Sequence, residues 1–169
     1  MQNRDIEAES LFQRALAINE KALGRQHPSI VLMLQNLSAI YASQNKFSEA
    51  YSVARESLEI SLQLFGAYHP RMGSACRTLA TVYALQGKYE EAERFAERSF
   101  TILKNTLGER HPETAQSLEM MVRLMWTTHR EREARQLEAR LNTIRQGSSF
   151  ESESESAEEA DRNGTLIEE

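Results

Sequence analysis

The chain has 169 residues, of which 40% are hydrophobic and 27% charged, and this is enough for one domain with a hydrophobic core. Residues that favour helices dominate, and only three prolines and seven glycines interrupt them, so a fold built on sheets is disfavoured. No apolar run approaches the roughly 20 residues of a membrane-spanning helix, and the charged N-terminal segment lacks the apolar centre of a signal peptide.

Charge divides the chain into two parts. Residues 1–146 contain 19 Lys and Arg against 17 Asp and Glu, a net charge of +2, whereas residues 147–169 contain one Arg and eight Asp or Glu, a net charge of −7. A body so close to neutral predicts no nucleic-acid partner, because nucleic-acid binding needs a concentrated basic surface. The tail is poor in apolar residues and rich in one charge, so we expect residues 147–169 to be disordered. It either keeps the protein soluble or folds back onto the body as an acidic pseudo-ligand.

Cys76 is the only cysteine, which rules out a disulfide within the chain and favours a reducing compartment. We therefore expect a cytoplasmic protein. Cys76 falls on the inner stripe of a predicted helix, where a small apolar side chain belongs in the core.

A period of 42 residues organises the chain. Four series of residues follow this spacing: Gly24, Gly66 and Gly108; His27, His69 and His111; Pro28, Pro70 and Pro112; and Ala8, Ala50, Ala92 and Ala134. Residues 28–69 and 70–111 are identical at 13 of 42 positions. Self-similarity at such a period is typical of a repeat architecture.

In chain order, one helix at the N-terminus is followed by units of two helices each. The first helix of a unit opens at proline, whose missing N–H needs no partner there, and carries an apolar stripe such as Leu34, Leu37 and Tyr41. A turn around Asn45 or Gly87 follows, where a left-handed backbone is expected. The second helix has small residues on its inner face and ends at glycine. The expected helices span about 6–23, 28–44, 47–65, 70–86, 89–107, 112–128 and 131–146.

No such pair of helices can bury its apolar stripe alone, so neighbouring pairs must stack. We therefore predict an all-α solenoid of antiparallel helix pairs over residues 1–146, with about three units after an N-terminal half-unit.

The pattern resembles the tetratricopeptide repeat. Its core positions are matched by Leu37, Ser38, Tyr41, Phe47, Ala50 and Ser57 in one unit, and by Leu79, Ala80, Tyr83, Tyr89, Ala92 and Ser99 in the next. The 42-residue length, the LG-x-x-HP segment between units and the QGKYEEAE turn are similar to the repeats of kinesin light chains and nephrocystin-3-like proteins. The resemblance covers about residues 6–146. It implies a right-handed superhelix that binds other proteins and is not an enzyme.

The two ends depart from this pattern. Residues 6–23 match only the second helix of a unit, so either the chain is part of a longer solenoid or another subunit covers this edge. Glu131 and Glu138 make the last helix polar, as a solenoid terminus that faces water requires.

In this family the first helices line a concave groove that holds peptides. Carrying these positions over one at a time predicts the groove residues Leu32, Gln35, Asn36, Ala39 and Ser43 in the first complete unit, Ser74, Arg77, Thr78, Thr81 and Leu85 in the second, and Gln116, Glu119, Met120, Arg123, Trp126 and Thr127 in the third.

The chemistry of these groove positions suits an acidic peptide. Arg77 and Arg123 offer planar forks of donors to carboxylates, unless they are solvated or paired with Glu119. Three further side chains offer apolar contacts: Leu85, Met120 and Trp126.

One position bears on how such a peptide would be held. In family members with a carboxylate clamp, an asparagine at the position of Asn36 helps to grip a peptide C-terminus. Thr78 and Met120 stand at the equivalent positions of the later units, so this clamp is incomplete.

No catalytic, metal or cofactor site is predicted. The periodic histidines are spread along the solenoid, whereas metal ligands must converge. The sequence has no Gly-rich phosphate loop and no evident pairing of a nucleophile with a base. We expect neither enzyme activity nor a cofactor.

Two functions remain open. The chain is either an adaptor or scaffold that binds a peptide of a partner protein in the groove, or a structural unit that self-associates as a homodimer through the uncapped N-terminal helix, with Leu11 and Leu16 as its apolar contacts.

Overall fold

The computed structural model describes residues 2–146, with side chains from residue 9 onward, and the acidic tail expected at 147–169 lies outside this range. The described part consists of seven helices without a strand, which confirms the all-α prediction. The helices are α1 (Gln2–Leu23), α2 (Pro28–Ser43), α3 (Phe47–Phe65), α4 (Pro70–Leu85), α5 (Tyr89–Leu107), α6 (Pro112–Thr127) and a last helix over residues 131–146. α1 begins earlier than the sequence predicted.

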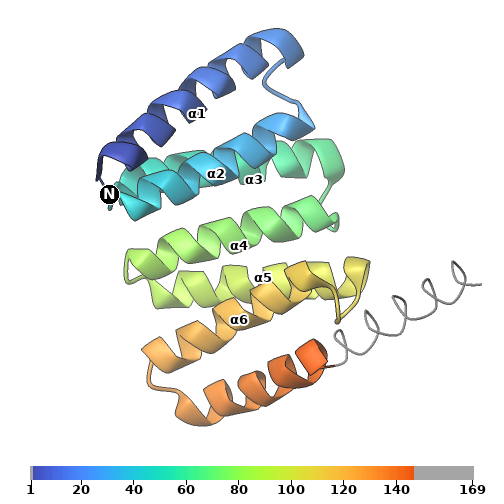
Figure 1. Ribbon diagram of the computed structural model, residues 1–169. Helices are drawn as coiled ribbons and strands as arrows, with labels where there is room; N and C mark the ends of the chain where they lie inside the picture. The colour runs from blue at the N-terminus through green and yellow to red at the C-terminus, as the bar shows by residue number, and fades with distance from the viewer. Residues whose placement is uncertain (1, 147–169) are drawn as a thin grey trace, which may run out of the picture.

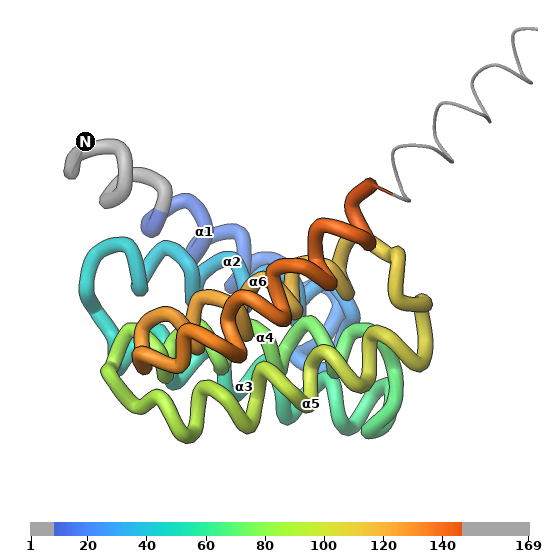
Figure 2. Tube along the Cα trace, turned by 90° about the horizontal axis from the view of Figure 1, so that it is seen from below, coloured from blue at the N-terminus to red at the C-terminus, as the bar shows by residue number. Residues whose placement is uncertain are grey.

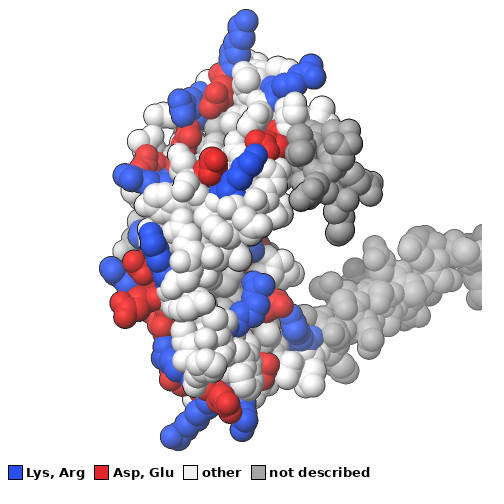
Figure 3. All heavy atoms as spheres, turned by 90° about the vertical axis from the view of Figure 1, so that its left-hand side faces the viewer, with Lys and Arg blue, Asp and Glu red and all other residues white. Residues whose placement is uncertain are grey.

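The helices stack as antiparallel pairs into an arc (Figure 1). From α1 to α6, each helix contacts the next one in the chain, and the first helices of neighbouring units, α2, α4 and α6, also contact one another in turn. The second helices α3 and α5 make no such contact, so they are spread apart on the outside of the arc. Figure 2, a view along the stack, separates α3 and α5 from α2, α4 and α6. The first helices therefore form the concave inner layer, and Figure 3 shows the concave side in profile, on the right of the picture.

Each first helix begins with the same local structure. His27, His69 and His111 lie in the extended region directly before the helix, and Nδ1 of each accepts a hydrogen bond from the backbone N–H two residues later at 3.2, 3.1 and 3.2 Å. The proline that follows contributes no N–H to be satisfied. The repeated His-Pro pair is thus an N-terminal cap, which explains its regular spacing.

The turns within units need a left-handed backbone. Asn45 has a φ of 59° and Gly87 a φ of 74°, as their residue types predicted. His129 takes this conformation in the third unit with a φ of 59°. Asparagine and histidine tolerate this region better than most side chains do.

Small residues allow the layers to approach closely. Ala50, Ala54, Ala92 and Ala96, on the second helices, are fully buried in the core. Gly73 of α4 lies against α5, where an added Cβ would stand 2.6 Å from a side-chain carbon of Leu103. The buried apolar residues form a series of clusters along the stack.

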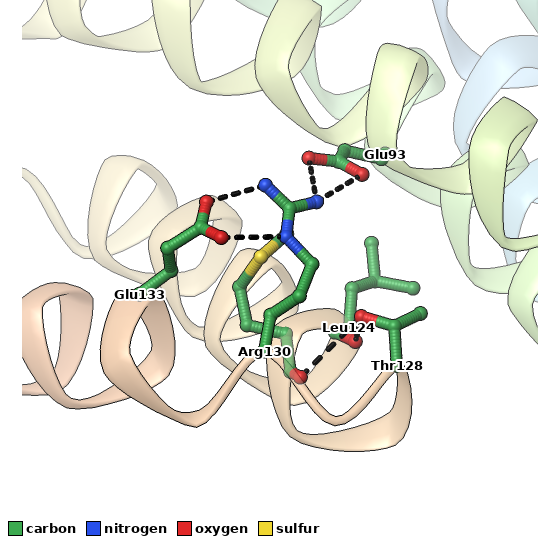
Figure 4. A network of polar contacts seen from close by, with 6 residues as sticks. Glu93, Leu124, Thr128, Arg130 and Glu133 are labelled. Atoms are coloured by element: carbon green, nitrogen blue, oxygen red, sulfur yellow. Dashed lines mark hydrogen bonds and ion pairs between the residues drawn. The ribbon is translucent and has the colours of Figure 1, made fainter.

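A network around Arg130 attaches the last helix to the second unit (Figure 4). Arg130 donates from Nη1 to both carboxylate oxygens of Glu93 at 2.7 and 2.8 Å, and it also pairs with Glu133. These carboxylates raise the pKa of Arg130 above its ordinary value, and Arg130 lowers the pKa of Glu133. The turn before it is closed by Thr128, whose hydroxyl donates to the carbonyl of Leu124 at 2.8 Å.

Candidate functional site

Two adjoining pockets lie on the inner layer. The first has a volume of about 500 Å³ and is lined by Leu32, Gln35, His69, Pro70, Arg71, Ser74, Arg77, Leu107, His111, Glu113 and Gln116. The second has a volume of about 310 Å³ and is lined by Leu32, Gln35, Asn36, Ser38, Ala39, Ala42, Arg77, Thr78, Thr81 and Val82. They share Leu32, Gln35 and Arg77, so one hollow runs from α2 across α4 to the start of α6.

Most of the predicted groove residues of the first two units line this hollow. They are Leu32, Gln35, Asn36, Ala39, Ser74, Arg77, Thr78 and Thr81, and Gln116 joins them from the third unit. Ser43 and Leu85 lie at the exposed C-terminal ends of α2 and α4 and line neither pocket. The same holds for the rest of the predicted third-unit set: Glu119, Met120, Arg123, Trp126 and Thr127.

Arg77 is the central cation of the hollow. Its Nε is buried and has no hydrogen-bond partner among the described residues. Burial of the guanidinium lowers the pKa of Arg77 below its ordinary value, Glu113 opposes this shift and Arg123 adds to it. A buried donor without a partner costs free energy, so Nε of Arg77 is a polar group that the folded chain leaves unsatisfied.

Arg123 lies on α6, near enough to Arg77 for the two charges to repel. It is exposed, and its guanidinium has no hydrogen bond or ion pair with any residue that the structure describes. The alternative pairing of the arginines with Glu119 is not observed, because the carboxylate of Glu119 pairs with Arg145 at 3.1 Å. The inner face therefore carries two guanidinium groups that lack an acidic partner within hydrogen-bonding distance.

The expected apolar contacts of the third unit are placed differently. Met120 is buried in a core cluster with Ala80, Ala92 and Ala134, so it does not line the hollow. Trp126 is partly exposed, its Nε1 donates to Glu138 of the last helix at 3.2 Å, and it lines neither pocket. Thr127 donates back to the carbonyl of Arg123 at 2.8 Å. Leu32, which is half exposed, is the apolar side chain that lines both pockets.

The sequence analysis missed the end of the hollow nearest the helix starts. Six residues of the first pocket were not predicted: His69, Pro70, Arg71, Leu107, His111 and Glu113. Glu113 is held by the hydroxyl of Ser74, which joins the start of α6 to α4. The periodic His-Pro pair marked these turns, but it indicated only helix starts and gave no sign that the starts of two units line one cavity.

No three His, Cys, Asp or Glu side chains in residues 9–146 are grouped so that they could hold a metal ion. Cys76 is buried in α4, and burial raises the pKa of its thiol to about 11. Within residues 2–146, no helix combines the length and apolar character needed to cross a bilayer.

Comparison with known proteins agrees with this architecture. A model of the family described as tetratricopeptide repeat matches residues 1–63, 49–105 and 74–145. A comparison with curated proteins gives no match.

Three crystal structures have the same fold. Two are of nearly identical tetratricopeptide-like repeats from Podosopora anserina, described as a kinesin light chain. One of them has a TM-score of 0.71 and 23% identity, and the match covers 88% of this chain and 70% of that chain. The other has a TM-score of 0.67 and 24% identity, and the match covers 87% of this chain and 70% of that chain. The third is BtubC (BKLC) from P. vanneervenii, with a TM-score of 0.75 and 20% identity over 87% of this chain and 59% of that chain.

The resemblance to kinesin-light-chain repeats is thus confirmed at the level of the fold. Repeats of this kind are a non-enzymatic scaffold type and generally mediate protein–protein interactions. The chain belongs to the tetratricopeptide repeat family.

Proposed function

We propose that this chain is an adaptor that binds a peptide segment of a partner protein in the concave hollow, and that the segment is acidic. One observation carries the proposal: Arg77 and Arg123 lie on the inner layer without an acidic hydrogen-bond partner among the described residues, although many other arginines of the chain are paired. The lone buried cysteine favours the cytoplasm as the setting.

The hollow supplies the other contacts that a peptide needs. Asn36, Gln35 and Gln116 have amides that both donate and accept, which suits a peptide backbone. Leu32 can pack against one apolar side chain of the ligand. Glu113 limits the choice of ligand, because its charge repels a second carboxylate placed close to Ser74. We therefore expect an acidic residue near Arg77 and Arg123, and an apolar residue near Leu32.

The test is fluorescence anisotropy with dye-labelled synthetic peptides that carry one leucine among glutamates. We expect Arg77→Glu/Arg123→Glu to weaken binding at least about tenfold, because two attractive charges become repulsive. The matched control is Arg94→Glu/Arg98→Glu, which reverses two charges on α5 in the outer layer. Equal losses of affinity in the two variants would show that only net charge matters and would refute the proposal that the peptide binds in the hollow.

Self-association through α1 is a second candidate function. It is favoured by the exposure of Leu11 and Ile18 along one side of this helix. Leu16, which the sequence analysis grouped with Leu11, instead packs against the cluster of Ile30, Val31 and Leu34.

A test of self-association must therefore leave Leu16 in place, since changing it would disturb the core. Light scattering would reveal a dimer that Leu11→Glu/Ile18→Glu converts to a monomer. A wild-type monomer at high concentration would eliminate this candidate.

A further inference from the structure

The second helices of the units share two apolar positions. Seven residues apart on each helix, these positions are occupied by Leu11 and Ile18 in α1, Val53 and Ile60 in α3, Phe95 and Ile102 in α5, and Leu137 and Ile144 in the last helix. The second position is isoleucine all four times. Residues seven apart lie on the same side of a helix, so each pair forms one stripe.

In three of the four helices a first helix covers this stripe. Ile60 packs against α2, Ile102 against α4 and Ile144 against α6, and their exposed fractions are only 6%, 5% and 6%. The residues at the first position, Val53, Phe95 and Leu137, pack against the same three clusters. The stripe is thus the surface through which a second helix holds the first helix of its own unit.

The stripe on α1 has no such cover within the described residues. Ile18 is 66% exposed and Leu11 is 62% exposed. α1 packs with its other side against α2, and this contact leaves the two side chains free. The internal repeat therefore indicates that a helix can cover the stripe on α1, because the same two positions pack against a helix in every later unit.

The charges beside the stripe indicate the chemistry of that helix. Arg14 lies three residues after Leu11, and Lys21 lies three residues after Ile18, so both flank the stripe on the same side. Both are exposed, and neither forms an ion pair or hydrogen bond with a residue that the structure describes. A second copy of α1 would set these cations against identical cations, whereas an acidic helix would neutralise them.

We infer that this edge binds an amphipathic helix of another protein, whose apolar stripe covers Leu11 and Ile18 and whose acidic flank faces Arg14 and Lys21. The mode is a helix laid onto an apolar face, with charges that set its register and orientation. The far end of the solenoid does not provide such a helix, because the last helix presents exposed Glu131, Arg132 and Arg135 to solvent. This site is separate from the concave hollow, which is lined mainly by the first helices.

The probes are two dye-labelled synthetic helices of about 20 residues with one shared leucine stripe, flanked by glutamates in one and by lysines in the other. Anisotropy with the full chain should show the glutamate helix binding at least about tenfold more tightly, and Arg14→Glu/Lys21→Glu should reverse this preference. Leu11→Ser/Ile18→Ser should weaken binding of the glutamate helix by at least about tenfold. Because both side chains are exposed, circular dichroism should show an unchanged fold.

Leu62→Ser is the matched control, since Leu62 is also an exposed leucine but lies on α3. It should bind as the wild type does. Arg77→Glu/Arg123→Glu should also leave helix binding unchanged. This variant therefore tests helix binding at α1 independently of peptide binding in the hollow. Equal affinity for the two probes, or binding insensitive to Leu11→Ser/Ile18→Ser, would overturn the inference. A wild-type dimer that Leu11→Ser/Ile18→Ser dissociates would assign the edge to a second copy and overturn it as well.

Discussion

Gly73 shows how one residue sets the spacing of two helices. The Cβ of an alanine there would lie 2.6 Å from Cγ and 2.9 Å from Cδ2 of Leu103, a side chain that is fully buried and cannot easily move. Gly73→Ala should therefore destabilise the fold by about 1–3 kcal/mol from overpacking, offset by about 1 kcal/mol of improved helix propensity. Urea denaturation measures the net effect, and a variant more stable than wild type would contradict the close approach. Adding Leu103→Ala should remove the overpacking penalty, because the space is then empty.

Cys76 should be protected from modification by its burial. Its pKa is raised to about 11, so the thiol is almost entirely neutral at pH 8 in the folded protein, while in the unfolded chain it ionises near its ordinary value. Labelling with a thiol reagent at pH 8 should be slow in buffer and fast in denaturing urea. The raised pKa also means that its contribution to stability is complete below the unfolded pKa and is lost as the pH rises towards 11. Labelling at the same rate with and without urea would show that the side chain is accessible.

Individual residues also show how much of the lining of the groove could be predicted from the sequence. The resemblance to the tetratricopeptide family predicted most of the residues that line the hollow in the first two units, among them Asn36 and Thr78. The third unit holds Met120 at the equivalent position, and this long apolar side chain fills space left by alanines of adjacent helices. Spacing alone indicates a position on a helix, but the volume available in the neighbouring helices decides whether the side chain is buried.

At the scale of elements, the periodic histidines are structural. His111 accepts a hydrogen bond from the N–H of Glu113 at 3.2 Å and so satisfies one of the free donors at the start of α6. His111→Ala should lower the free energy of unfolding by about 1 kcal/mol, whereas His111→Asn should retain most of it, because asparagine also caps helices. Thermal and urea denaturation of the two variants gives the comparison. Equal losses would mean that the imidazole contributes by packing and not as a cap.

Helix boundaries were predictable where the sequence contains such local signals. Proline after histidine begins α2, α4 and α6, and Gly66 and Gly108 end α3 and α5. α1 has no His-Pro start, and its beginning at Gln2 was not predicted. Boundaries without a cap depend on packing that the sequence does not reveal.

At the scale of the whole molecule, curvature creates the hollow. The backbones of α2, α4 and α6 approach one another in turn, whereas those of α3 and α5 lie farther apart. The 42-residue period predicted the stacking of pairs, but the two pockets depend on how residues from three helices meet. The same stack has unequal ends, since α1 exposes Leu11 and Ile18 whereas the last helix exposes charges.

The most direct test of the central claim is to map a bound peptide on the isotope-labelled chain by NMR. An acidic peptide with one leucine should shift the amide resonances of Gln35, Asn36, Arg77 and Thr78 on α2 and α4 and of Gln116 on α6. It should leave the resonances of Arg94 and Arg98 on the outer helix α5 unchanged. These shifts should disappear with Arg77→Glu/Arg123→Glu. Shifts concentrated on α3 and α5, with the inner layer unchanged, would contradict the proposal that the concave hollow is the binding surface.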